Sequence, residues 1–178
     1  NVAIPSLSLD LGATAADIQW IIDAYSLIFA ALLLTTGALS DRYGRKRWLH
    51  VGVALFGIGS LAASFSNSVE TLIAARPFLA VSAAFILPST LSLVVATFPK
   101  DERAKAIGIW TATFGAGFAL GPVIGGYLVE TFSWTAVFLL NIPVSIVALT
   151  GGYFFITDSR DERAAQGDPP GWVLRGFG

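Results

Sequence analysis

Two ionisable residues, Asp23 and Arg76, lie inside otherwise apolar stretches of this sequence. An Arg inside a membrane span costs at least ~2.5 kcal/mol on insertion scales, so it is expected to face a cavity or a partner. A carboxylate in such a place can load and release a proton, or balance a cationic substrate. We therefore predict that Asp23 serves proton coupling or substrate binding, and that Arg76 faces a cavity or a partner. The alternative places both near the membrane surface, with Asp23 hydrated and the Arg76 side chain extended towards water.

A short charged segment, Gly37–Arg47, separates two of these apolar stretches. Its glycines, Gly37 and Gly44, permit close backbone approach and unusual turn geometry. Asp41 is expected at the start of a short turn or helix, where it would accept free backbone N–H groups. The cations of this segment are expected to pair with acids or anionic lipid; they are Arg42, Arg45, Lys46 and Arg47. A loop that only marks membrane topology would explain these cations but not the spacing of the glycines and Asp41.

A third pattern combines five glycines with one proline. Its members are Gly108, Gly117, Gly121, Pro122, Gly125 and Gly126. Small residues let membrane helices approach closely, and Gly117 and Gly121 form a GxxxG pair. Pro122 removes a backbone hydrogen bond and bends a helix. The pattern predicts a close-packed helix face with a function of its own, and a face that serves packing alone is the alternative.

The elements that must position these residues are five long apolar stretches, at residues 18–39, 48–65, 72–98, 106–128 and 134–156. A helix of about 20 residues crosses a bilayer and satisfies its own backbone hydrogen bonds there. The shorter apolar segment 2–11 is expected to be the end of a helix whose beginning is missing. We therefore predict an all-α membrane protein with a helical bundle at residues 1–156 and a polar linker at 157–178.

Lys and Arg are distributed unevenly among the connections. Ten of the eleven lie in residues 41–47, 99–105 and the tail after 156. The connections 10–17, 66–71 and 129–133 contain none. Because cytoplasmic loops collect Lys and Arg, we expect the cationic side to face the cytoplasm. Asp101 and Glu102 on that side are candidate partners for the cations of Gly37–Arg47.

Composition agrees with a membrane protein and argues against several other classes. The chain is 54% hydrophobic and 13% charged, whereas globular domains carry about 25% charged residues. It contains no Cys and one His, His50, and it lacks a phosphate-binding G-x-x-x-x-G-K-[ST] pattern. A net charge of −1 gives no indication of nucleic-acid binding. We expect no cofactor, no metal and no enzymatic activity.

The spacing of Gly37–Arg47 resembles the loop between the second and third helices of major facilitator superfamily transporters. The glycine and proline pattern of residues 108–126 resembles the helix-five motif of antiporter members of that superfamily. Three further segments resemble fourteen-helix drug:proton antiporters; they are residues 1–5 (NVAIP), 19–25 (QWIIDAY) and 133–143. The resemblance extends to about residue 160. One departure follows Arg76, where the family usually has a Gln and glycines and this chain has Pro77 and Phe78.

The resemblance implies the N-terminal six-helix half of a multi-pass inner-membrane transporter, followed by a cytoplasmic linker and a C-terminal half outside this sequence. It implies proton-coupled export of small lipophilic compounds by alternating access. In the family, the Gly37–Arg47 loop latches the two halves in the outward-facing state, and an Arg at the position of Arg76 is associated with proton transfer. Two alternatives are a transporter of another specificity, such as sugar or metabolite uptake, and a non-transporting membrane scaffold.

Overall fold

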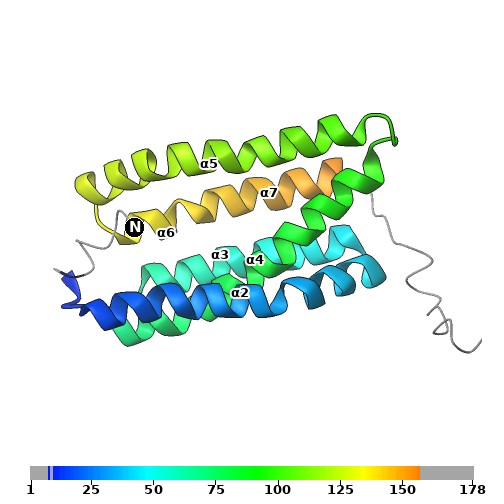
Figure 1. Cartoon of the computed structure of the whole chain (residues 1–178). Coiled ribbons are helices and arrows are strands. Elements are labelled where there is room, and N and C mark those ends of the chain that lie inside the picture. Colours follow the sequence, from blue (N-terminus) through cyan, green and yellow to red (C-terminus); the bar gives the residue numbers. More distant parts are fainter. Residues whose placement is uncertain (1–7, 9, 157–178) are drawn as a thin grey trace, which may run out of the picture.

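The computed structural model describes residue 8 and residues 10–156, and this part of the chain is helical without strands. The helices are α2 (Ala15–Tyr43), α3 (Arg45–Ser64), α4 (Val69–Thr97), α5 (Arg103–Thr131), α6 (Thr135–Leu139) and α7 (Asn141–Phe155), arranged as an elongated bundle (Figure 1). The prediction of an all-α membrane fold is confirmed. Most of the segment 2–11 and all of 157–178 lie outside the described residues, so the expected first helix and linker remain predictions.

Four of the helical segments are long and apolar enough to cross a membrane. They are Ala15–Tyr43, Val69–Thr97, Arg103–Thr131 and the combined segment Thr135–Phe155. The predicted stretch 48–65 corresponds to the apolar part of α3, which begins with three cations and reaches Ser64. Helices α2, α3, α4 and α5 are longer than the predicted stretches because they continue into polar residues, whereas the combined segment Thr135–Phe155 is slightly shorter than the predicted stretch 134–156.

Polar capping fixes where α2 and α4 begin. The Thr14 side chain accepts a hydrogen bond from the Asp17 backbone N–H, and Asp17 accepts one from the Thr14 N–H in return. Ser68 and Thr71 form the same reciprocal pair at the start of α4. These contacts satisfy two of the N–H groups that a helix leaves free at its N-terminus.

The last predicted stretch, 134–156, is divided into α6 and α7 at Leu140. Pro143 explains the division, because proline has no N–H to donate to the carbonyl of Leu139 and its ring crowds that carbonyl. The backbone of Leu140 is itself helical, and its N–H donates to the Ala136 carbonyl at 3.0 Å. The two helices therefore act as one membrane-length segment with a local irregularity.

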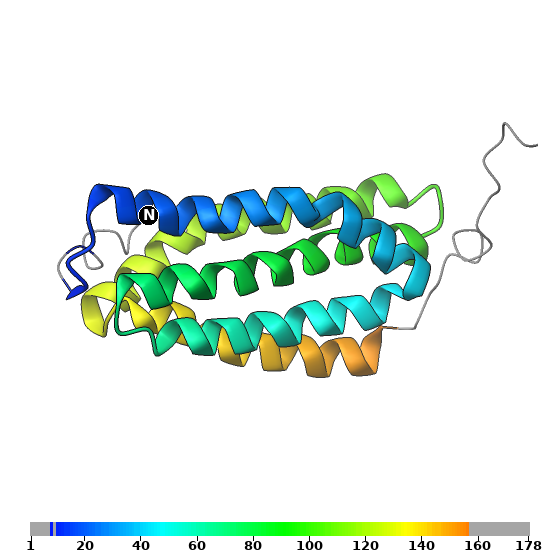
Figure 2. The ribbon, with the colours of Figure 1, turned by 90° about the horizontal axis from the view of Figure 1, so that it is seen from below.

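Helix α4 lies at the centre of the bundle and packs against both α2 and α3. Helix α7 lies on α3, whereas α5 lies at the edge and contacts mainly α4 and α6. Both views place the α2–α3 turn, the α4–α5 turn and the end of α7 at the same end of the molecule (Figures 1 and 2). We call this the cation-rich end, because all the described Lys and Arg residues except Arg76 lie there.

Close packing in the bundle depends on glycines of α3. A Cβ added to Gly52 would lie 3.0 Å from the Phe85 Cβ, and one added to Gly59 would lie 3.2 Å from Leu79 Cδ2. These glycines let the backbone of α3 approach α4 closely. Many large apolar side chains point outward instead, including Leu34, Phe118 and Phe155, each more than 80% exposed. Such a surface suits lipid, because soluble monomers rarely expose large continuous apolar patches.

Candidate transport site and latch loop

Arg76 lies in α4, two turns from its start, and is half-buried against α2. Its guanidinium carbon lies 5.6 Å from the centre of the Tyr25 ring, close enough for a cation–π interaction. Its buried Nε has no hydrogen-bond partner among the described residues. A buried donor without a partner destabilises a fold. Arg76 therefore combines a favourable aromatic contact with an unsatisfied hydrogen-bond donor.

Asp23 lies on α2, two residues before Tyr25, and is half-buried. Both of its carboxylate oxygens accept hydrogen bonds from Gln19 Nε2, each at 3.0 Å. Within the described residues, Asp23 forms no ion pair with Arg76. The structure therefore places the two predicted residues on adjacent helices without joining them, and Tyr25 is the residue of α2 that meets Arg76.

The predicted loop Gly37–Arg47 is mostly helical, which corrects one expectation. Helix α2 continues to Tyr43, and only Gly44 separates it from α3. Gly44 adopts φ 115°, a conformation that favours glycine, and its N–H donates to the Ser40 carbonyl at 3.1 Å. Asp41 thus lies in the last turn of α2 and does not cap the start of a helix.

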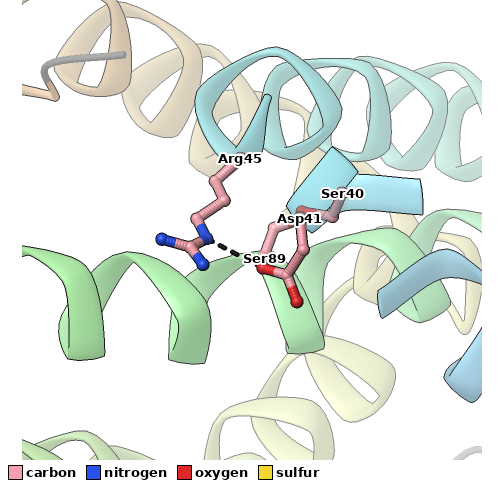
Figure 3. A network of polar contacts seen from close by, with 4 residues as sticks. All are labelled: Ser40, Asp41, Arg45 and Ser89. Carbon is pink, nitrogen blue, oxygen red and sulfur yellow. Dashed lines mark hydrogen bonds and ion pairs between the residues drawn. The ribbon is translucent and has the colours of Figure 1, made fainter. Parts of the chain in front are cut away.

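Asp41 pairs with a cation of the same segment. Arg45 Nε donates to Asp41 Oδ1 at 2.8 Å, across the turn between α2 and α3 (Figure 3). This is the single ion pair of the described part of the chain, so Asp101 and Glu102 pair with none of the cations there. Arg42 is exposed and lies over the Tyr43 ring at 5.4 Å. The segment is therefore a tight helical corner held by its own Asp and Arg.

Buried polar contacts join this corner to α4. Ser40 Oγ lies 2.8 Å from Ser89 Oγ, and both residues are fully buried (Figure 3). One turn earlier, the Thr36 hydroxyl donates to the Ala84 carbonyl at 2.6 Å. A Cβ added to Gly37 would lie 3.5 Å from the Pro88 Cβ, an ordinary packing distance. The first glycine of the predicted latch therefore lies where α2 contacts α4 at ordinary packing distance.

Lys46 connects the same corner to α7. Its Nζ donates to the Tyr153 carbonyl at 2.9 Å and lies 5.4 Å from the Tyr153 ring centre. Cations stabilise the free carbonyls at a helix C-terminus. One turn along α3, His50 Nδ1 lies 2.7 Å from the Lys46 carbonyl, and its ring packs against Gly152. Lys46 thus contacts a helix end, where the sequence had suggested an acid or a lipid.

The predicted helix-five motif lies entirely within α5, on the exposed side of the bundle. A Cβ added to Gly108, Gly117, Gly121 or Gly125 would have no described atom within 4 Å. Pro122 lies inside α5, which remains continuous around it. The close-packed face predicted from the glycines therefore has no partner among the described residues, and the packing remains a prediction.

Sequence reasoning missed the contacts that hold the bundle together. They include Thr36 to Ala84, Ser40 to Ser89, Asn141 to Ser60 at 3.1 Å, and Trp110 to Thr90 at 3.3 Å. The available signal was a small polar residue inside an apolar stretch, because such a residue needs a partner in lipid. That signal identifies the residue but not which helix supplies its partner.

Comparison with known proteins gives the same family for the whole segment. The family model described as Major Facilitator Superfamily matches residues 1–174. The methyl viologen resistance protein SmvA of Salmonella typhimurium is 49% identical over 150 residues, which cover 84% of this chain and 30% of SmvA. The tetracenomycin C resistance and export protein of Streptomyces glaucescens is 42% identical, over 97% of this chain and 32% of the relative.

A third relative, the riboflavin transporter RibZ of Clostridioides difficile, is 39% identical over 98% of this chain and 38% of its own length. This chain therefore spans about a third of the length of the curated relatives it matches. The family match, the helical bundle with membrane-length segments, and the Gly37–Arg47 corner agree with one another. The chain belongs to the major facilitator superfamily of membrane transporters.

Proposed function

We propose that this chain is the N-terminal half of a proton-coupled exporter of small lipophilic compounds in the cytoplasmic membrane. Two of the relatives described above carry names of resistance or export proteins, which supports efflux. Alternating access would come from rocking of this helical half against a C-terminal half around a site near the midplane. The cation-rich end would face the cytoplasm, and the parent protein would have fourteen helices or, as the alternative, twelve.

The environment of Arg76 is the observation that most supports proton coupling. A guanidinium at the α2–α4 interface, with a buried Nε unpartnered within the described residues, destabilises the fold. A functional role would explain why the chain keeps it. In the proposal, Arg76 interacts with a proton-carrying acid or a substrate in the cavity between the halves. Asp23 is a second candidate for proton or substrate binding, and its pairing with Gln19 holds the carboxylate on α2.

The Gly37–Arg47 corner would act as the conformational latch between the halves. The latch residues are Gly37, Asp41, Arg42, Gly44, Arg45 and Lys46. Three of them already form side-chain hydrogen bonds within this half: Asp41 with Arg45, and Lys46 with the end of α7. Arg42 is exposed at the surface and is therefore the residue best placed to contact the C-terminal half.

The test uses the full-length protein in inverted membrane vesicles with two probes: tetraphenylphosphonium, a lipophilic cation, and methyl viologen, the hydrophilic dication in the name of one relative. We expect an imposed pH gradient to drive accumulation of a transported probe, and that probe to dissipate the gradient in return. Arg76→Gln should reduce this exchange at least tenfold, whereas Lys105→Gln, which removes an exposed cation from the start of α5, should leave it intact. Efflux that persists after the pH gradient is collapsed would contradict proton coupling.

Metabolite transport is the second candidate, because one relative is named a riboflavin transporter. The same vesicles distinguish the two, with riboflavin replacing the two probes. Movement of riboflavin without movement of either probe would favour the second candidate. Absence of any transport by a well-inserted protein, across a broad panel of compounds, would instead favour a non-transporting scaffold.

A further inference from the structure

Helix α4 contains a proline, Pro88, in its buried cation-rich half. An α-helix bonds each N–H to the carbonyl four residues earlier, and proline has no N–H. The carbonyl of Ala84 therefore loses its partner within the helix. Ala84 is fully buried, so water does not reach this carbonyl from the surface. A buried carbonyl without a hydrogen bond destabilises a fold, more so where the surroundings are apolar.

Thr36 of α2 supplies the missing donor. Its hydroxyl lies 2.6 Å from the Ala84 oxygen, across 48 residues of sequence, and the residue is only 3% exposed. The same hydroxyl lies 2.9 Å from the Leu32 carbonyl and 3.2 Å from the Leu33 carbonyl. Those two carbonyls belong to its own helix and can bond the N–H groups of later residues there. The Ala84 carbonyl has no such donor, so it is the acceptor that needs Thr36.

The neighbouring contacts make the same two helices meet over one further turn. Gly37 faces Pro88 at packing distance, and Ser40 bonds Ser89. Residues 36 and 40 are one helical turn apart and therefore lie on one face of α2. Asp41 follows Ser40 directly in the chain, and its pairing with Arg45 forms the corner of the predicted latch.

We propose that Thr36 is a positioning residue, whose hydroxyl closes the hydrogen-bond gap left by Pro88 and pins α2 to α4 as one rigid unit. The pin holds the latch corner at a fixed place relative to α4, the helix that carries Arg76. Its effect on transport rests on the proposed function, whereas the coupling between Thr36 and Pro88 does not. The two parts are therefore tested by separate measurements.

The first measurement is a double-mutant cycle on the unfolding equilibrium of the full-length protein in mixed detergent micelles with SDS. Thr36→Val keeps the shape of the side chain and removes the donor, and we expect it to raise the unfolding constant by about 3- to 20-fold, as for other interhelical hydrogen bonds in membranes. Pro88→Ala restores the backbone N–H that the Ala84 carbonyl lacks. In that background, Thr36→Val should change the constant less than twofold.

Two controls test whether the effect of Thr36→Val comes from loss of the Thr36 hydroxyl or from any threonine-to-valine change in this helix. Thr36→Ser keeps the donor and should behave like the unmodified protein. Thr35→Val makes the same substitution at the preceding, exposed position and should change the unfolding constant less than twofold. An equal cost of Thr36→Val with and without Pro88 would overturn the proposal, and so would an equal cost at Thr35.

The second measurement asks whether α2 and α4 stay together during transport. Ser40→Cys with Ser89→Cys, in a full-length protein from which any other Cys has been removed, replaces two hydroxyls 2.8 Å apart by thiols that can form a disulfide of about 2.05 Å. We expect methyl viologen efflux to be the same with the disulfide formed and reduced. Efflux that stops on oxidation and returns on reduction would overturn the rigid unit. If neither the double variant nor the unmodified protein moves a probe, the proposed function fails, and the double-mutant cycle alone decides whether Thr36 joins α2 to α4.

Discussion

At the scale of single residues, the charges of this chain are distinguished by what neutralises them. Asp41 and Arg45 neutralise each other across a helical corner, and Asp23 is held by the amide of Gln19. Arg76 has an aromatic ring and no acid within the described residues. A charge that the local structure leaves unbalanced is the better candidate for a partner that arrives during function, such as a proton carrier or a substrate.

Asp41→Asn should abolish methyl viologen efflux by the full-length protein and leave its folding almost unchanged. The pair is partly exposed, with 37% exposure for the Asp41 side chain, and i,i+4 pairs of this kind contribute about 0.3–0.5 kcal/mol. The variant keeps an oxygen for Arg45 but loses the charge that orders the latch corner. The measurement is efflux in inverted vesicles, with membrane abundance determined in parallel.

Asp101→Asn is the matched control for that variant. It removes an exposed carboxylate from the next turn of the same end, where no ion pair is present among the described residues. We expect normal efflux from it. Normal efflux from Asp41→Asn as well would show that the corner marks topology and has no latch function.

At the scale of helices, glycine determines which pairs pack closely, and the two groups of glycines differ. Gly52 and Gly59 of α3 face α4 at 3.0–3.2 Å, whereas the glycines of α5 face open space in the described bundle. The helix-five pattern was visible in the sequence because its spacing is regular. The α3 glycines were missed because no spacing rule separates them from glycines that merely occur in an apolar stretch.

Gly152→Val should destabilise the contact between α3 and α7, whereas Gly151→Val should be tolerated. A Cβ on Gly152 would lie 3.1 Å from both Cε1 and Nε2 of His50, and a Cβ on Gly151 would meet nothing within 4 Å. Overpacking costs about 1–3 kcal/mol, while changes at open positions usually stay within about 0.5 kcal/mol. The two variants share the same substitution, so unfolding in SDS compares their packing directly.

His50→Ala in the Gly152→Val background tests the cause of that effect. Removing the imidazole makes room for the new side chain, so the double variant should regain part of the lost stability. No recovery would mean that Gly152→Val acts through the helix backbone and not through His50.

Gly121→Leu should leave the described bundle folded and eliminate coupled efflux. The added side chain meets no described atom, so the cost must come from a partner outside the described residues. Val123→Leu, at a 68% exposed position two residues away, should retain efflux. Gly52→Leu should instead lower the amount of folded protein, because its Cβ would already be crowded by Phe85 and Ile86. Full activity of Gly121→Leu would leave the helix-five pattern without a role in transport.

The sequence predicted the helices well and their mutual contacts poorly, for a physical reason. Length and apolarity indicate membrane helices one at a time, and charged connections indicate where each one turns. Contacts such as Thr36 with Ala84 depend on the register between helices far apart in sequence. Helix α4 is apolar on nearly every side, so no stripe of residues indicates which face meets α2 and which meets α3. The end of α2 was also misjudged, because the charged residues Asp41 and Arg42 suggested a loop although they continue the helix.

At the scale of the whole molecule, charge is separated between the two ends of the bundle. The turns at one end carry Arg42, Arg45, Lys46 and Arg47 together with Lys100 and Arg103. The opposite end carries no Lys or Arg among the described residues outside the spans, and it includes Asp10, Asp17 and Glu70. Since an excess of Lys and Arg in short loops sets orientation, the cation-rich end should face the cytoplasm.

That orientation is tested by labelling single cysteines in the otherwise Cys-free chain with a membrane-impermeant maleimide on intact cells. Asn67→Cys, exposed in the turn between α3 and α4, should be labelled from outside. Lys100→Cys, exposed in the turn between α4 and α5, should be labelled only after the membrane is permeabilised. The two turns lie at opposite ends of α4, so a single orientation cannot expose both to the same side. Labelling of Lys100→Cys but not Asn67→Cys on intact cells would invert the topology, and the latch corner would then face the exterior.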